Sequence, residues 1–313
     1  SIERLLAAIR AADTTRIEGF VELGFGYDSN VNSATAASQI TIPAAVPGIG
    51  GATFVLAPGS RERHDAFAAL SGGLNLTHKL NENWALVGAA AGSARLHRDE
   101  DRFDQLTLDG SAGARWSRER DAVTVGAQIQ SFELDDARLR ETKGLVAQWQ
   151  HSYDERRQAS VFGQYSALRY PAQSIRDADR SVLGVAYGRA FAVRYAPVLF
   201  GSAYTGTERE RASGVPHLGH ELRGVRLGAE LRLGQGWGVL ASASHEERRY
   251  GGTEPLFAEA RKDRQSDLSA GISYLLRART TLLAQLAYTD NRSNIPIHAF
   301  DRTVGTLSVR FAF

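Results

Sequence analysis

The sequence predicts an all-β fold, namely a transmembrane antiparallel β-barrel of about 14 strands with a short N-terminal helix. Three observations carry this prediction. Apolar and polar residues alternate with a period of two along most of the chain, as they do in a strand with one apolar and one polar face. The alternating segments are about as long as a tilted membrane-crossing strand must be. Short and long connections also alternate, which is typical of barrels whose tight turns all lie on one side of the membrane.

The helix is expected at the start of the chain. The apolar residues there follow the i, i+3, i+4, i+7 spacing that places side chains on one helical face: Ile2, Leu5, Leu6 and Ile9. After residue 15 the period changes from that of a helix to that of a strand and does not change back. We therefore expect a short amphipathic helix over residues 1–15 and a barrel over residues 16–313.

The strands follow in order, spaced about 20 residues apart. In one of them Val225, Leu227 and Leu231 share the apolar face, while Arg226 and Glu230 lie on the polar face. The expected strands are 16–28, 64–79, 83–97, 103–118, 121–134, 138–153, 157–170, 179–190, 195–208, 220–233, 237–250, 263–276, 279–291 and 300–313.

The connections are of two kinds, tight turns and longer loops. The tight ones are 81–83, 119–120, 154–156, 234–236 and 277–279, and the long polar ones include 173–179, 208–219 and 251–262. The first loop, residues 29–60, carries no charge and contains three prolines, so it cannot be a helix. Its apolar stretches, residues 40–42 and 54–56, would be costly to leave in water as a patch. We expect this loop to pack into the barrel mouth or to offer a surface to a partner.

A soluble β-sandwich is the competing architecture, because its strands also alternate. Sandwich strands are usually about 5–6 residues long, however, and the segments here are about twice that length. Aromatic residues near the strand ends on the apolar face also suit a girdle at two membrane interfaces. They are Tyr27, Trp84, Trp116, Trp237, Tyr274 and Phe313. The barrel is therefore favoured.

Composition limits the partners and the chemistry. The 37 Lys and Arg residues nearly balance the 35 Asp and Glu residues, and the net charge of +2 does not suggest a nucleic-acid partner. There is no Cys, which excludes a disulfide scaffold, a thiolate metal site and a cysteine nucleophile. No charge-free apolar run reaches the ~18 residues of a transmembrane helix, so contact with membrane lipid is expected from strands.

The C-terminal strand ends on alternating apolar residues, Val309, Phe311 and Phe313. A final aromatic residue after such alternation resembles the β-signal by which the barrel assembly machinery recognises bacterial outer-membrane proteins. The alternative is an ordinary amphipathic strand. We favour the assembly signal.

The segment that closes the first predicted strand is Gly26-Tyr27-Asp28-Ser29-Asn30-Val31-Asn32. By its residues alone it is a polar, turn-forming exit from a strand, since Asp and Asn bond their own backbone and tolerate left-handed conformations. It also resembles a motif of barrels that follow tetratricopeptide repeats, in particular the barrel of the surface lipoprotein assembly modifier (Slam) family.

That resemblance covers nearly the whole chain. In the Slam family a periplasmic helical-repeat domain precedes an outer-membrane barrel of similar strand number. The resemblance implies that residues 1–15 are the periplasmic end of such a domain or its linker. It also implies a location in the outer membrane of a Gram-negative bacterium, with a surface lipoprotein or secreted protein as client.

Charged residues on the polar faces are expected to point into the lumen: Glu18, Glu22, Asp109, Arg115, Arg226, Glu230, Arg232 and Arg310. They could form a conduit for a polar or charged substrate. They could instead compensate one another inside a narrow barrel. The mixture of signs favours compensation.

No catalytic or metal site is expected. His217 and His220 share a loop, but no Cys and no acidic residue in a ligand pattern accompanies them, so half of a zinc site would be empty. Nothing in the sequence singles out a nucleophile, a base and an orienting group that lie within reach of one another. No cofactor is expected either.

Three functions are compatible with these features. The first, which the family resemblance supplies, is a translocation barrel that assists export or surface display of a client lipoprotein. The second is a porin-like export channel for a polysaccharide or solute, and the third is an outer-membrane enzyme. Periodicity alone supports only the barrel. We expect a protein that is not an enzyme.

Overall fold

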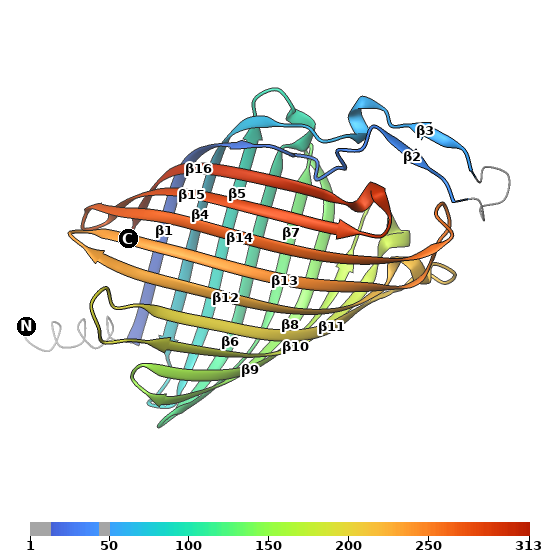
Figure 1. The fold of residues 1–313 in the computed structure, drawn as a ribbon. Coiled ribbons are helices and arrows are strands. Elements are labelled where there is room, and N and C mark those ends of the chain that lie inside the picture. The colour runs from blue at the N-terminus through green and yellow to red at the C-terminus, as the bar shows by residue number, and fades with distance from the viewer. Residues whose placement is uncertain (1–13, 44–50) are drawn as a thin grey trace, which may run out of the picture.

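The computed structural model describes residues 14–43 and 51–313, which form a closed antiparallel barrel of fourteen strands (Figure 1). Each barrel strand pairs with the barrel strands that precede and follow it in the sequence, and β1 pairs with β16 to close the barrel. The predicted all-β barrel and its strand number are confirmed. The predicted N-terminal helix lies outside the described residues, apart from its last two positions. Among the described residues, no helix is both long and apolar enough to cross a membrane.

The barrel strands are β1 (Thr15–Asp28), β4 (Asp65–Lys79), β5 (Trp84–His97), β6 (Gln105–Arg118), β7 (Asp121–Leu134), β8 (Ala137–Asp154), β9 (Arg157–Arg169), β10 (Ala178–Ala190), β11 (Val198–Glu210), β12 (His220–Gly234), β13 (Trp237–Glu254), β14 (Glu259–Arg277), β15 (Thr280–Ser293) and β16 (Phe300–Ala312). Two short strands, β2 (Gln39–Thr41) and β3 (Thr53–Val55), form a separate hairpin within the first loop.

Three of the predicted strand boundaries are wrong by three residues or more. Most of the long polar loop expected at 251–262 is strand, because β13 continues to Glu254 and β14 begins at Glu259. The residues there are mostly polar and do not alternate with apolar ones, so the sequence contained no sign of a strand, although the backbone pairing continues across them. The start of β11 is Val198 rather than residue 195, because Tyr195 and Ala196 have φ values of 70° and 37° and turn the chain before the strand begins.

The apolar face of each strand points outward. Apolar side chains such as Ile17, Phe25 and Leu227 are each 62% exposed, whereas the polar side chains that alternate with them point to the interior. Such a continuous apolar exterior would be unstable in water and matches the lipid-facing band of a membrane barrel. Large aromatic residues, among them Trp84 and Trp237, lie on this surface close to the strand ends. This is the arrangement of an interfacial girdle.

Site-directed spin labels on β12 provide a test of this topology. Labels at Leu227 and Leu231 should be accessible to a lipid-soluble relaxation agent, because alternate side chains of a strand point to opposite faces. Labels at Arg226 and Glu230 should be accessible only to a water-soluble agent. Equal accessibility at all four positions would contradict the barrel orientation.

Candidate functional site at the loop end of the barrel

The two ends of the barrel differ in their connections. At the turn end, where β1 begins and β16 ends, short turns such as 119–120, 235–236 and 278–279 join the strands. The opposite end, here called the loop end, carries the first loop and most of the other long connections, and the β2–β3 hairpin lies there (Figure 1).

Exposure of the inward-facing side chains changes from one end to the other. On β1, Glu18 near the turn end is largely exposed, Glu22 is half-buried, and Asp28 at the loop end is 0% exposed. The same change occurs around the barrel. The inward-facing residues that are buried at the loop end include Asp28, Phe67, His97, Leu168, Ala178, Leu222, Asp263 and Asn291. The interior is therefore open at the turn end and packed at the loop end.

A layer of ion pairs fills much of the packed region. We call it the loop-end layer, and it consists of Arg95, Arg180, Arg248, Arg261 and Arg302 with Asp28, Glu208, Glu246 and Asp263. Arg248 Nε lies 2.6 Å from Glu246 Oε1, and Arg261 Nη2 lies 2.6 Å from Asp263 Oδ2. The Tyr204 hydroxyl donates to Glu246 at 2.8 Å. Opposite charges therefore largely compensate one another here, with five guanidinium groups against four carboxylates.

Some of the predicted lumen charges also have polar partners. Arg310 Nε donates to Glu22 at 2.6 Å, and Ser308 donates to the same carboxylate at 2.7 Å. Asp109 accepts a hydrogen bond from Gln130 at 2.7 Å. The guanidinium of Arg226 stacks 5.0 Å from the centre of the Tyr204 ring.

The other predicted lumen charges lie toward the turn end. Glu18 pairs with Arg16, and Arg115 Nε donates to Ser117 at 3.3 Å. Glu230 and Arg232 are exposed near the end of β12. The structure therefore does not bring the eight residues together as one site.

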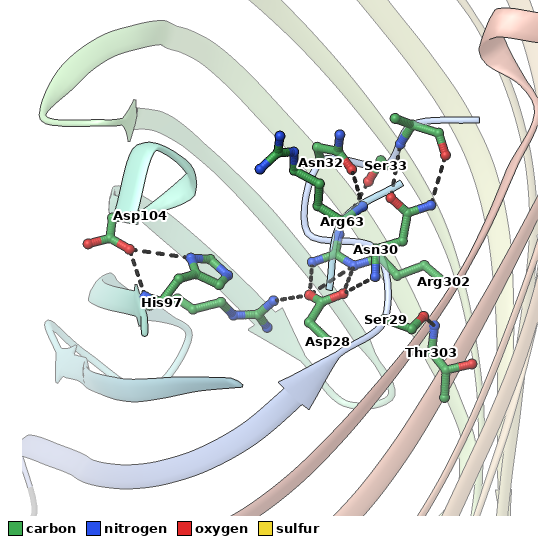
Figure 2. A network of polar contacts seen from close by, with 12 residues as sticks. Asp28, Ser29, Asn30, Asn32, Ser33, Arg63, His97, Asp104, Arg302 and Thr303 are labelled. Carbon is green, nitrogen blue, oxygen red and sulfur yellow. Dashed lines mark hydrogen bonds and ion pairs between the residues drawn. The ribbon is translucent and has the colours of Figure 1, made fainter. Parts of the chain in front are cut away.

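Asp28 is the centre of the polar network at the end of β1 (Figure 2). Arg302 of β16 donates to both carboxylate oxygens, with Nε at 2.9 and 3.0 Å. Arg95 of β5 adds a contact of 3.1 Å from Nη1. The backbone N–H of Asn30 also donates to Asp28 Oδ1 at 3.0 Å, which forms the expected Asx turn. One buried carboxylate thus links three strands.

Ser29 and Asn30 extend the seam between β1 and β16 beyond its regular ladder. The N–H of Ser29 donates to the carbonyl of Thr303 at 3.0 Å, and the Ser29 hydroxyl accepts from the N–H of Thr303 at 2.8 Å. The Asn30 side-chain amide donates to the carbonyl of Asp301 at 2.8 Å. These side chains bond the exposed edge of β16 where β1 has already ended.

The remaining motif residues attach the first loop to its return segment. Asn32 donates to the carbonyl of Arg61 at 2.7 Å and accepts from the N–H of Arg63 at 3.1 Å. Val31 is buried, and its N–H donates to the carbonyl of Arg63 at 2.7 Å. Gly26 is required sterically, since a Cβ there would lie 2.4 Å from the carbonyl oxygen of Gly305 and from the Phe67 ring. Tyr27 points outward and is about half-exposed.

Glu100 supports the same region from the next loop. Its carboxylate pairs with Arg63, which lies beside the motif, and with Arg102 at 3.1 Å. Burial acts to raise the pKa of Glu100, but these two guanidinium groups more than offset it and hold the pKa below its ordinary value. The pair is therefore ionised at neutral pH.

Together these contacts make the motif a latch, which we define as residues 26–32. It closes the seam and fixes the first loop to the barrel. Sequence reasoning identified the motif but missed its partners Arg95, Arg302 and Arg63. An Arg that alternates with apolar residues near a strand end gives only a weak signal for such a role.

The β2–β3 hairpin is held at the loop end by apolar contacts. Ile40 and Ile42 are 8% and 1% exposed and pack with Phe257 and Ile295 of two other loops. Phe54 lies directly opposite Ile40 and so shares its side of the hairpin, yet it is 45% exposed, whereas Val55 on the other side is 72% exposed. Of the two expectations for this loop, packing at the mouth holds for Ile40 and Ile42 and for Leu56 of the second apolar stretch, whereas Phe54 and Val55 are exposed.

At the turn end, Phe313 completes the seam. Its N–H donates to the carbonyl of Gly19 at 2.9 Å, and the Gly19 N–H donates in return at 2.8 Å. A Cβ at Gly19 would lie 2.7 Å from the Phe313 ring, so the absent side chain makes room for it. Phe311 stacks against Phe313, and Val309 lies on the same outward face.

Replacing Phe313 by Ala should lower the amount of folded, heat-modifiable barrel in the outer membrane several-fold, because the seam loses its ring contact and the last strand its proposed recognition residue. The measurement is the ratio of folded to unfolded bands on gels of unheated samples. Phe54→Ala is the matched control and should leave the ratio unchanged. An unchanged ratio for the Phe313 variant would show that Phe313 is not part of an assembly signal and that β16 is an ordinary strand.

The described part of the chain offers no group of three or more His, Asp or Glu side chains with metal-binding geometry. His220 points inward and stacks on Tyr250, with ring centres 5.0 Å apart, whereas His217 lies in the preceding short 3₁₀ turn, Pro216–Leu218. The two histidines therefore have separate surroundings.

Comparison with protein families matches residues 19–312 to the model described as "Surface lipoprotein assembly modifier". This match covers nearly the entire barrel. A search of curated proteins finds no match.

Solved outer-membrane structures share the fold. An anion-selective porin from Comamonas acidovorans is 11% identical, with a TM-score of 0.50 over 96% of this chain and 99% of the porin. OmpT, an outer membrane protein of Vibrio cholerae, is 8% identical, with a TM-score of 0.53 over 96% and 98%. The outer membrane channel DcaP of Acinetobacter baumannii is 13% identical, with a TM-score of 0.51 over 96% and 97%. At such identities the similarity shows the fold alone.

Proposed function

Because the chain belongs to the surface lipoprotein assembly modifier family, whose outer-membrane barrel acts in the surface assembly of lipoproteins, we propose that it assists a client lipoprotein to reach the outer face of the membrane. The loop end would face the outside and the turn end the periplasm, together with the N-terminus. Strands with short periplasmic turns and longer outer loops are general in such barrels.

The gradient of burial in the interior supports this role over diffusion of solutes. A solute channel needs a continuous aqueous path, whereas here inward-facing apolar residues such as Leu168 and Leu222 are buried at the end that also holds the loop-end layer. The open turn end, by contrast, has a cavity of about 1090 Å³ whose lining mixes polar and apolar residues, among them Ser152, Gln158 and Phe200. This vestibule is accessible to a polypeptide from the periplasmic side in the proposed orientation.

The strongest support for the proposal comes from the β2–β3 hairpin. It is uncharged, it is fixed to the rim by Ile40 and Ile42, and it presents Phe54 and Val55 to solvent. Exposed apolar residues on a fixed element are typical of a protein-binding surface. We assign this surface to the client.

Two further partners belong to the proposal. Membrane lipid would cover the apolar exterior, and the barrel assembly machinery would recognise the last strand through Val309, Phe311 and Phe313. We propose no catalytic step, and the role is one of transport and assembly.

Surface display of a lipoprotein provides the test. A strain that lacks this protein should keep the client lipoprotein inside, where added protease cannot digest it, and the complete gene should restore digestion on intact cells. The total amount of client should stay constant. If the client is equally accessible with and without the protein, the proposed function is wrong.

A further inference from the structure

The outer surface of β13, β14 and β15 near the loop end contains two cross-strand pairs of like charge. Arg249 of β13 lies directly opposite Lys262 of β14. Arg264, two residues further along β14, lies directly opposite Arg292 of β15. All four side chains point outward, since Asp263 between them is buried in the interior. Like charges in directly opposed positions destabilise a sheet unless something neutralises them.

The acids nearby neutralise these cations only in part. Glu247 lies 3.8 Å from Arg264 Nε and also accepts two bonds from Arg223, and Asp290 lies 2.9 Å from Arg292 Nε. Within the described part of the chain, neither Arg249 nor Lys262 forms an ion pair. The acids also include Asp301 of β16, which lies directly opposite Asp290. Five positive charges (Arg223, Arg249, Lys262, Arg264 and Arg292) against four negative ones (Glu221, Glu247, Asp290 and Asp301) give a net of +1. The side chains of Arg264 and Arg292 are 72% and 82% exposed, so an external anion can reach both.

An apolar groove lies directly below this cationic patch on the lipid-facing surface. It has a volume of about 820 Å³, and its walls include Leu199, Leu227, Leu268 and Tyr288. Small residues such as Ala243 and Ala270 form its floor, so the surface is recessed there between the larger side chains. A groove of this shape and polarity suits an acyl chain.

The separation of patch and groove matches that of a lipid head and its chains. Leu268 in the groove and Arg264 in the patch are four residues apart on β14, or about 13 Å along the strand. A long Arg side chain can bend part of this distance toward the membrane. A head at the level of Arg264 would thus have its chains at the level of the groove.

We propose that this surface binds one phosphorylated glycolipid of the outer leaflet, with its phosphate between the two like-charge pairs and an acyl chain in the groove. Phosphate groups suit this patch because guanidinium groups bind them through paired, charge-assisted hydrogen bonds. The inference rests on the orientation proposed above, with the loop end outside, and is otherwise independent of the client.

Native mass spectrometry of the purified barrel with added lipid A is the test. Substitution of all four cations (Arg249→Gln, Lys262→Gln, Arg264→Gln and Arg292→Gln) should weaken lipid A binding by at least about tenfold, since each basic group near an anionic head contributes separately. Lipid A without its phosphates should bind the unaltered barrel equally weakly. Ala270→Phe, which fills the groove, should also weaken binding while the patch stays intact.

A matched control removes the same charge at the turn end, with Arg118→Gln, Arg156→Gln, Arg277→Gln and Arg279→Gln. This variant should bind lipid A like the unaltered barrel, and gel heat-modifiability should show that both variants are folded. Equal binding by the two variants would overturn the proposal, as would stronger binding of phosphatidylglycerol than of lipid A. Client display is scored separately, so failure here is distinguishable from failure of the proposed function.

Discussion

Asp28→Asn should destabilise the barrel by about 3–5 kcal/mol, the cost of removing one partner from a buried ion pair. The substitution preserves size and keeps an oxygen for the Asn30 N–H, but it leaves Arg302 and Arg95 without their shared carboxylate. Both arginines lie in the packed loop end, where the side chains of Arg95 and Arg302 are only 28% and 21% exposed and water compensates the lost charge poorly. The free energy of unfolding should be measured by urea titration of tryptophan fluorescence in lipid vesicles.

Asp109→Asn is the control for this measurement. Asp109 also faces the interior, but it is exposed and accepts one hydrogen bond, from Gln130. Its substitution should change the free energy of unfolding by less than about 1 kcal/mol. The combination of Asp28→Asn with Arg302→Met should recover part of the loss, because no unpaired guanidinium then remains at that position. If the two single Asn variants are equally stable, the latch does not hold the seam.

Phe54→Asp combined with Val55→Asp should abolish most surface display of the client, with an expected fall on the order of tenfold or more, because buried apolar contacts dominate protein–protein binding. Two carboxylates would carry a large desolvation cost in such a contact. The barrel should fold normally, since both side chains are exposed and neither belongs to the buried cluster that holds the hairpin. Display is measured by protease accessibility of the client on intact cells.

Exposed apolar residues of other loops provide a matched control. Ile175 and Leu256 are 52% and 39% exposed on two other loops of the loop end. Ile175→Asp with Leu256→Asp introduces the same charge without touching the hairpin and should leave display intact. A loss of display in both double variants would indicate a general charge effect, and normal display in both would show that the hairpin surface is not used.

The architecture could be predicted because each strand carries its own signal. In β12, for example, the alternation of Arg226, Leu227 and Glu230 assigns each side chain to a face without knowledge of any other strand. The number and approximate spans of the strands follow from repeating this step. The ends of β13 and β14 could not be found in this way, because the residues there do not alternate between apolar and polar.

Only the motif itself, and not the residues that it contacts, could be predicted from the sequence. Asp28, Ser29, Asn30 and Asn32 form a recognisable polar run, but their main partners are far away in the sequence. Asp28 and Arg302 are 274 positions apart and meet only because the barrel closes. The docking of Ile42 against Ile295 has the same origin. Local patterns give no information on contacts made by closure.

Photo-cross-linking in living cells tests the central claim most directly, namely that the client contacts the free side of the β2–β3 hairpin. A photoreactive amino acid at Val55, which is 72% exposed, should form a covalent adduct with the client lipoprotein. The same amino acid at Leu307, which is 67% exposed on the lipid-facing side of β16, should form none. An adduct at Val55 alone is the predicted result, whereas no adduct at Val55, or equal adducts at both positions, would contradict the account.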